Sequence, residues 1–211
     1  PPDEDRIKEA IGTVLRADSE AGVIRITWSS GLGTLGSARG NSPGTLIVST
    51  QERKIWPTSE SLHIVPWPRN ERGALTGLKT TSYAENVLAL ETAHRHDCDE
   101  ALFLNTTGAL CEGTGTNIFL VINEELVTPP ISSGCLAGIT RELVLEIAEV
   151  TERDISPSEL SNCKEAFITS STRDLSPVSR FDDLAVPLVP GPVTEKVAQA
   201  FSRLKSSQPD P

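Results

Sequence analysis

The sequence has no methionine, a single tyrosine and an aromatic content of only 4%. Because Met is absent and the chain opens with Pro1 and Pro2, we expect it to be the remainder of a longer protein. It lacks any apolar run near the roughly 20 residues that a membrane-spanning helix requires, and no secretory segment is visible. We therefore expect a cytoplasmic protein that makes no membrane contact.

Cysteine and histidine are too sparse and too scattered to predict a metal site or a disulfide framework. The four cysteines include no Cys-x-x-Cys pair: Cys98, Cys111, Cys135 and Cys163. The three histidines receive no catalytic role: His63, His94 and His96. The net charge of −10, from 19 basic and 29 acidic side chains, disfavours binding to nucleic acid. The expected partner is a small-molecule substrate.

Periodicity in the sequence predicts a mixed chain of helices and strands, of the α+β class. Helical spacing covers 3–17, 82–96 and 143–150. Strands are predicted at 23–28, 45–50, 62–66, 101–104, 118–122, 125–128 and 166–169. A polar, proline-rich stretch begins at Pro66 and is typical of a boundary between domains. We predict the remainder of a small N-terminal domain over 1–70, a linker over 71–78 and a larger β-rich domain over 79–211.

A glycine motif in the first third of the chain offers one alternative function. Gly31, Gly33 and Gly36 have the G-x-G-x-x-G spacing of a dinucleotide-binding fingerprint and follow a predicted strand. That fingerprint requires a helix after its last glycine, because the helix N-terminus holds the pyrophosphate. The residues that follow, 37–44, are rich in Gly, Ser and Pro. We interpret the motif as a loop between two strands.

Lys79 and Glu112 have the chemistry that pyridoxal phosphate requires. Lys79 opens the stretch KTTSYAENV, and Glu112 lies in the stretch CEGTGTNIF. A lysine can hold the aldehyde of the cofactor as a Schiff base, and a carboxylate can keep its pyridine nitrogen protonated. Taken singly, Lys79 is more often a surface lysine. Glu112, in or beside an irregular connection, is more often a solvated loop carboxylate.

Two clusters of small residues are suited to the phosphate of such a cofactor. The run Gly138–Thr140 is placed where a helix is expected to begin, so its amides could donate to a dianion. The run Ser170–Thr172 offers three hydroxyls just after a strand. Each cluster alone is more often an ordinary helix cap or turn.

Together, the order and spacing of these stretches resemble the class IV aminotransferases, the fold-type IV pyridoxal-phosphate enzymes. Lys79 and Glu112 are separated by 112 − 79 = 33 positions, and Asn117 then opens an Asn-Ile-Phe element. A GITR element at 138–141 and a Ser/Thr-rich turn that leads to Pro-Val at 177–178 follow in the same order. The resemblance covers roughly residues 3–195. It implies a small N-terminal α/β domain and a larger, β-rich cofactor domain.

The resemblance also implies a role for each matching residue. Lys79 would bind the cofactor and move the proton, Glu112 would pair with the pyridine nitrogen, and Tyr83 would hydrogen-bond the phenolic oxygen. The phosphate would be held by the two small-residue clusters: Ile139, Thr140, Ser170, Ser171 and Thr172. The family places a phosphate-binding arginine in an N-terminal helix that is absent here, and we expect it upstream. Family members form homodimers.

The substrate depends on the subfamily. The stretch 24–39 is most similar to the glycine-rich segment of aminodeoxychorismate lyases, which release 4-aminobenzoate and pyruvate for folate synthesis. It differs from the Arg-Pro-rich equivalent of branched-chain aminotransferases. We therefore favour the lyase, with transamination of branched-chain or D-amino acids as the alternative. Arg25 and Arg39 are candidates to bind substrate carboxylates, and they are equally typical of surface arginines.

Overall fold

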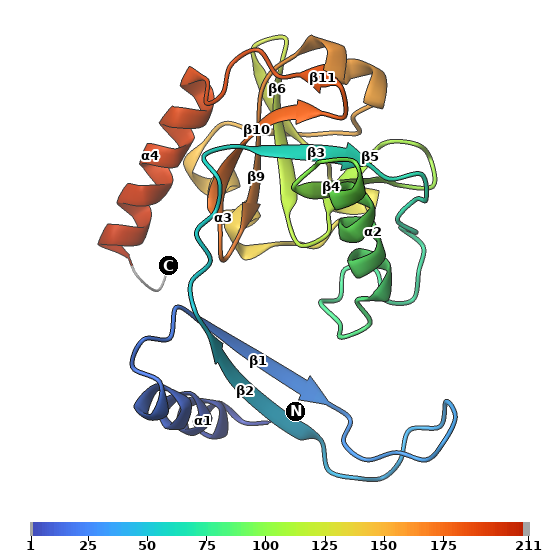
Figure 1. Cartoon of the computed structure of the whole chain (residues 1–211), viewed down its shortest axis with the longest axis vertical. Helices are drawn as coiled ribbons and strands as arrows, with labels where there is room; N and C mark the ends of the chain where they lie inside the picture. Colours follow the sequence, from blue (N-terminus) through green and yellow to red (C-terminus); the bar gives the residue numbers. More distant parts are fainter. Residues whose placement is uncertain (1, 209–211) are drawn as a thin grey trace. The chain divides into compact units, whose positions relative to one another are not determined.

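A helix and a two-stranded antiparallel sheet make up the first unit of the chain, which extends to Trp56 in the computed structural model (Figure 1). The structure describes residues 2–208. Helix α1 spans Glu4–Ala17, and strands β1 and β2 span Val23–Ser29 and Thr45–Gln51. Asp3 caps α1 by accepting the Arg6 amide hydrogen. Residues 30–44 contain neither helix nor strand, so the predicted glycine-rich loop is confirmed.

The second unit, from Pro57 onward, contains one curled, nine-stranded mixed sheet (Figure 1). The strands are β3 (Glu60–Ile64), β4 (Glu100–Leu104), β5 (Leu110–Gly113), β6 (Asn117–Ile122), β7 (Glu125–Thr128), β8 (Thr151–Glu152), β9 (Cys163–Ser170), β10 (Asp174–Phe181) and β11 (Leu184–Ala185). Their order is β5-β4-β3-β10-β9-β6-β7-β8, with β11 paired to β10. This mixture of helices with a large sheet confirms the predicted mixed α/β class.

Strand β3 corrects the predicted assignment of residues 57–70 to the small domain. It lies in the large sheet, where it runs parallel to both β4 and β10. Leu62 is fully buried there and pairs with Glu100 in the register of β4. The division between the two units therefore falls at Trp56 and Pro57. Local propensity finds a strand but does not reveal which sheet it joins.

Three longer helices cover the sheet: α2 (Ala84–Arg95), α3 (Ile139–Ile147) and α4 (Pro192–Ser207). Helix α2 packs on β3 and β4, whereas α3 and α4 pack on β9 and on each other (Figure 1). Short 3-10 helices lie at Ile131–Ser133 and Pro157–Asn162. None of the helices in residues 2–208 is long and apolar enough to cross a membrane.

Apolar side chains fill both faces of the sheet. One cluster includes Leu62, Leu120 and Ile168, all fully buried. On the face covered by α3 and α4, the rings of Phe119 and Phe167 stack with their centroids 4.9 Å apart. Burial of this kind on both faces gives β6 an unbroken apolar run rather than an alternating one. The sheet is therefore a well-packed support for the loops at its ends.

Candidate active site

Lys79 lies in the connection that leads into helix α2. Its Nζ donates a hydrogen bond to the Tyr83 hydroxyl oxygen, 3.2 Å away, and both side chains are exposed. Tyr83 is the N-cap residue of α2, and its own side chain makes no capping bond. The predicted position of Lys79 just before a helix is therefore confirmed. The amine and the phenol are brought together by the turn that begins the helix.

Glu112 lies in β5, beside the irregular connection 114–116 that leads to β6, as predicted. The strand is short, lies at the edge of the sheet and pairs with β4 through a register shift, so it has little sequence signature. The side chain is 12% exposed. Burial raises the pKa of the Glu112 carboxyl, while the Leu136 amide and the charges of Arg69 and Lys79 act to lower that pKa. The charge of Lys79 thus reaches Glu112 even though the two side chains come from different elements.

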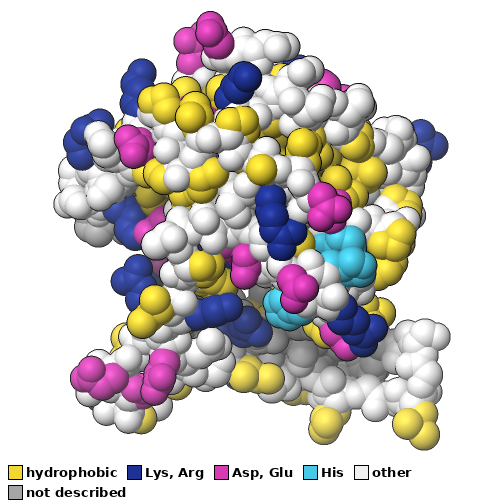
Figure 2. Space-filling view, turned by 45° about the horizontal axis from the view of Figure 1, so that its top comes forward, with side chains coloured by type: hydrophobic (Ala, Val, Ile, Leu, Met, Phe, Trp, Pro, Cys, Tyr) yellow, Lys and Arg dark blue, Asp and Glu magenta, His cyan; other side chains and the backbone are white. Residues whose placement is uncertain are grey.

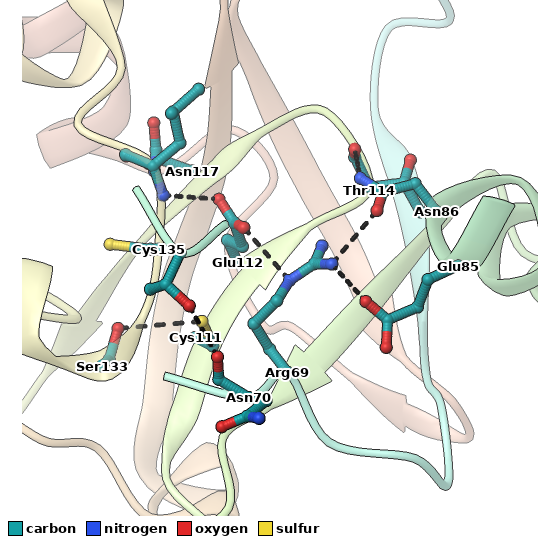
Figure 3. Close-up of polar contacts among 12 residues, drawn as sticks. Arg69, Asn70, Glu85, Asn86, Cys111, Glu112, Thr114, Asn117, Ser133 and Cys135 are labelled. Carbon is teal, nitrogen blue, oxygen red and sulfur yellow. Dashed lines mark hydrogen bonds and ion pairs between the residues drawn. The ribbon is translucent and has the colours of Figure 1, made fainter. Parts of the chain in front are cut away.

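Arg69 was missed by the sequence analysis, which interpreted its surroundings as linker. Its guanidinium Nε lies 3.3 Å from Glu112 Oε1, and its Nη1 lies 2.7 Å from Glu85 Oε2 and 3.1 Å from Asn86 Oδ1 (Figure 3). The guanidinium also lies over the ring of Phe103, 4.0 Å from its centroid. The one sequence signal was an arginine within an otherwise loop-like, proline-rich stretch.

The backbone of Leu136 connects Glu112 to the segment that leads into helix α3. Its N–H donates to Glu112 Oε2 at 2.9 Å, and its C=O accepts from Asn117 Nδ2 at 2.9 Å. A Cβ on Gly138 would stand only 2.3 Å from Asn117 Oδ1, so the glycine permits this close packing. The carboxylate and the N-terminus of α3 are therefore held by the same short segment.

The N-terminus of α3 is open to an anion. Gly138 is its N-cap residue, and no side chain makes a capping hydrogen bond there. The first amides of a helix have no intrahelical acceptor, so those of Ile139 and Thr140 can donate to a ligand. Thr140 is buried, whereas the Ile139 side chain is 70% exposed.

The Ser170–Thr172 turn joins β9 to β10 and lies beside this helix start. In the sheet register, Asn117 pairs with Thr169, so the end of β9 is next to the residue that contacts Gly138. Ser170 Oγ and Thr172 Oγ1 are 3.4 Å apart, and the Ser171 and Thr172 side chains are exposed. The structure thus brings the two predicted small-residue clusters to one end of the sheet.

A buried ion-pair cluster anchors that turn. Arg173, the next residue, contacts Glu60 at 3.0 Å and Glu100 at 2.9 Å, and both carboxylates are almost fully buried. Glu100 also accepts the Thr114 amide hydrogen at 3.1 Å. Burial raises the pKa of Glu60, with the nearby charge of Arg173 opposing it. The cluster fixes the turn to the loop that follows Glu112.

Arg25 and Arg39 lie in the first unit and are both exposed. Their role in substrate binding stays a prediction. The histidine side chains reach the surface (Figure 2). Those of His63 and His96 stack with centroids 4.0 Å apart, and His63 Nδ1 lies 2.5 Å from Asp182 Oδ1.

Comparison with known proteins identifies the family. The family model for amino-transferase class IV matches residues 1–181. The chain belongs to the class IV aminotransferase family. A relative from Synechocystis, provisionally named branched-chain-amino-acid aminotransferase, is 32% identical over 155 residues, which are 70% of this chain and 50% of the relative. The chain spans about half the length of the curated relatives it matches.

Solved structures of this family have the same fold. The branched-chain aminotransferase of Thermobaculum terrenum, solved in its pyridoxal-phosphate form, is 27% identical with a TM-score of 0.84, covering 97% of this chain and 71% of its own. A Legionella pneumophila protein provisionally named 4-amino-4-deoxychorismate lyase is 24% identical with a TM-score of 0.80, covering 92% and 83%. The fold-type IV architecture implied by the sequence is therefore confirmed.

Pyridoxal phosphate is the cofactor of this family, and the residues present fit it. The second unit has an amine at Lys79, a mostly buried carboxylate at Glu112 and a phenol at Tyr83. For a phosphate it offers the uncapped N-terminus of α3 and the hydroxyl-rich turn after Ser170. This set of donors and acceptors matches each polar group of the cofactor in turn.

Proposed function

We propose that the second unit binds pyridoxal phosphate and that Lys79 removes a proton from an amino-bearing carbon of the substrate. The observation that carries this proposal is the convergence of Lys79, Tyr83 and Glu112. Lys79 donates to Tyr83, and the positive charge of Lys79 is one of the influences that lower the pKa of the mostly buried Glu112 carboxyl. When bound, the cofactor would supply an electron sink for the carbon that loses the proton.

Lys79 would first hold the cofactor through its amine and then act as general base and acid. Its exposed position suits both tasks, because a mobile amine can reach first the cofactor and then the substrate carbon. Tyr83, at 3.2 Å, would orient the amine and hydrogen-bond the phenolic oxygen of the cofactor. Tyr83 is the N-cap residue of α2, and Lys79 lies four positions before it.

Glu112 would accept a hydrogen bond from the protonated pyridine nitrogen. Its two oxygens already have partners: Oε1 faces Arg69, and Oε2 accepts from the Leu136 amide. An ionised carboxylate has about four lone-pair sites, so it retains capacity for one further donor. The fixed direction of the carboxylate would then determine where the ring lies.

The phosphate would be held where α3 begins and β9 ends. The amides of Ile139 and Thr140 and the hydroxyls of Ser170, Ser171 and Thr172 would donate to its oxygens. These groups bind a part of the cofactor that does not react. They would therefore contribute to cofactor affinity more than to the rate of the chemical step.

Of the two chemistries, we propose aminodeoxychorismate lyase, on the similarity of stretch 24–39 to that subfamily. Lys79 would take the proton from the amino-bearing ring carbon, and the C–O bond to the enolpyruvyl group on the neighbouring carbon would break. The released enolpyruvate takes up a proton and becomes pyruvate, and the ring becomes aromatic as 4-aminobenzoate. A second amino acceptor is not needed.

Transamination is the second candidate, and the comparisons favour it specifically. Branched-chain aminotransferases recur among both the curated relatives and the solved structures. In that reaction Lys79 would return the proton to the cofactor carbon, so that the amino group stays on the cofactor until a 2-oxo acid accepts it. The two reactions share the site described above and differ after the first proton transfer.

One assay separates them. Full-length protein loaded with cofactor is given aminodeoxychorismate without any 2-oxo acid, and pyruvate is measured. The proposal expects stoichiometric pyruvate and 4-aminobenzoate. If that substrate stays intact while a branched-chain or D-amino acid reacts with 2-oxoglutarate by ping-pong kinetics, the transaminase replaces the lyase. We also propose a homodimer, as the family implies, which sedimentation of the same sample tests.

A further inference from the structure

We propose that Arg69 is a positioning residue that keeps Glu112 ionised and aimed at the cofactor's pyridine nitrogen, and that it links this carboxylate to the first turn of helix α2. The inference rests on the proposed function, because the pyridine nitrogen is the expected partner of Glu112. The contact between Arg69 and Glu112 does not depend on the proposed function. The experiment therefore tests the effect of Arg69 on Glu112 separately from the binding of the cofactor.

The geometry of Arg69 is that of a bridge. Its Nε lies toward Glu112, whereas its Nη1 contacts Glu85 and Asn86, the second and third residues of α2 (Figure 3). Asn86 in turn donates to the Thr114 carbonyl oxygen, just beyond β5. The guanidinium therefore ties the strand that bears the carboxylate to the helix that follows Lys79. The guanidinium holds its donors in a rigid, planar fork, whereas a lysine ammonium is a compact point charge on a flexible stem.

The arginine is itself held firmly. Its side chain is 14% exposed, and it stacks over the fully buried ring of Phe103. Its backbone amide donates to the Leu104 carbonyl oxygen at 2.7 Å. A charge with so little freedom acts on Glu112 with a constant strength and direction. Burial alone would favour the neutral acid, and a neutral acid would not support a pyridinium.

The charged and titratable groups that act on Glu112 can be named. Arg69 and Lys79 lower the pKa of its carboxyl, together with the Leu136 amide. The thiols of Cys111 and Cys135 also face it, and burial raises their pKa, so they stay neutral near pH 7. Once Lys79 holds the cofactor, its amine is committed elsewhere. Arg69 is then the fixed side-chain cation left among these groups.

The test follows the charge of Glu112 directly. Full-length protein without cofactor is labelled with ¹³C at glutamate carboxyl carbons, and the Glu112 signal is assigned by its loss in Glu112→Gln. Its titration is compared in the parent, in Arg69→Gln and in Arg153→Gln. Arg153 pairs with Glu159 in a partly exposed ion pair, so its removal is the matched control.

The proposal expects the Glu112 midpoint in Arg69→Gln to rise by about one pH unit or more, since a neighbouring cation commonly lowers a carboxyl pKa by that amount. Arg153→Gln should leave it unchanged. Arg69→Lys should restore part of the shift, because it returns the charge without the fork. An unchanged midpoint in folded Arg69→Gln overturns the proposal.

A second variant guards against loss of folding. Glu85 is 48% exposed, so Glu85→Gln should fold. It removes a competing anion from Arg69, and the Glu112 midpoint should therefore fall. No movement in Glu85→Gln would contradict the bridge even if Arg69→Gln did not fold.

The loaded enzyme distinguishes this inference from the proposed function. The ¹⁵N shift of the labelled pyridine nitrogen should move toward the unprotonated value in Arg69→Gln, with kcat falling more than KM rises. One outcome supports the bridge and contradicts the cofactor assignment: the titration midpoint of Glu112 shifts in Arg69→Gln, but the ¹⁵N shift of the pyridine nitrogen is the same in Glu112→Gln as in the parent. If the midpoint does not respond, the bridge fails on its own.

Discussion

The first unit of the chain and the second differ in what holds their side chains in place. None of residues 2–56 is buried, and the apolar side chains of the hairpin, such as Ile26 and Ile47, are about half exposed. The second unit has a sheet with apolar clusters on both faces, and the polar residues at its ends have buried partners. The general chemistry that we propose rests on the second unit. The choice of the lyase rests on a stretch of the first.

The largest effect should come from Lys79→Ala in the second unit. Removing the amine removes both the covalent attachment of the cofactor and the base, so turnover should fall to background. Absorbance of the lysine-bound cofactor and its trapping by borohydride should both vanish. Lys164→Ala, at an exposed lysine of β9, is the control and should behave as the parent. Substantial turnover in Lys79→Ala would refute the assignment.

The difference in packing predicts a difference in stability. Phe119→Ala removes a fully buried ring that stacks on Phe167, and it should lower the free energy of unfolding by about 3–5 kcal/mol. Ile26→Ala, at a side chain that is 48% exposed, should cost less than about 1 kcal/mol. Urea denaturation of both variants measures this. Similar losses for the two would show that the hairpin is packed in solution.

Glu112→Gln should keep the cofactor bound and slow the reaction by two or more orders of magnitude. An amide cannot sustain the pyridinium charge, and breaking a buried ion pair typically costs several kcal/mol. Turnover at saturating substrate is the measurement. A rate equal to that of the parent would show that the carboxylate has only a structural role.

The residues proposed to hold the phosphate should contribute mainly to the affinity for the cofactor. Thr140→Ala combined with Ser171→Ala should weaken cofactor binding at least tenfold, since a hydrogen bond to a charged group contributes roughly 1.5–3 kcal/mol. The rate at saturating cofactor should change little, because these groups act equally in ground and transition states. Ser202→Ala, on an exposed face of α4, is the control. Equal cofactor affinity in the double variant and the parent would argue against this phosphate site.

The smallest effect is expected for Arg25→Ala and Arg39→Ala in the first unit. If these arginines bind substrate carboxylates, KM should rise by about tenfold with little change in kcat, as for lost uniform binding. Steady-state kinetics with each candidate substrate is the measurement. Unchanged KM for both variants would leave them as surface arginines.

Much of the fold could be predicted because its elements have strong local patterns. The helix of residues 4–17 and the strands of the hairpin lie within a residue of their predicted limits. Strand β10 is absent from the predicted set, because Pro177 argues against a central strand, yet it pairs there with Phe167. The partner of β3 depends on a parallel pairing between distant segments, which local sequence does not encode.

The candidate site was predicted unevenly for a similar reason. Lys79, Glu112 and the two phosphate clusters each have a short motif with a recognisable order. Arg69 has none, because its role depends on an isolated β-bridge with Asn105, just after β4, and on contacts with α2 that only the fold creates. The role of Asn117 could not be predicted either, since its side-chain amide donates to the carbonyl oxygen of Leu136, in a later loop.

The contact between Asn117 and Gly138 constrains how homologous sequences can vary. A methyl group at 138 would overlap the Asn117 amide oxygen, and the amide cannot turn away without releasing the Leu136 carbonyl. The two positions should therefore change together in evolution, so that alanine at one accompanies a smaller residue at the other. A covariation search centred on this pair would separate homologues that keep the hydrogen bond from Asn117 to the Leu136 carbonyl from those that build the start of α3 in another way.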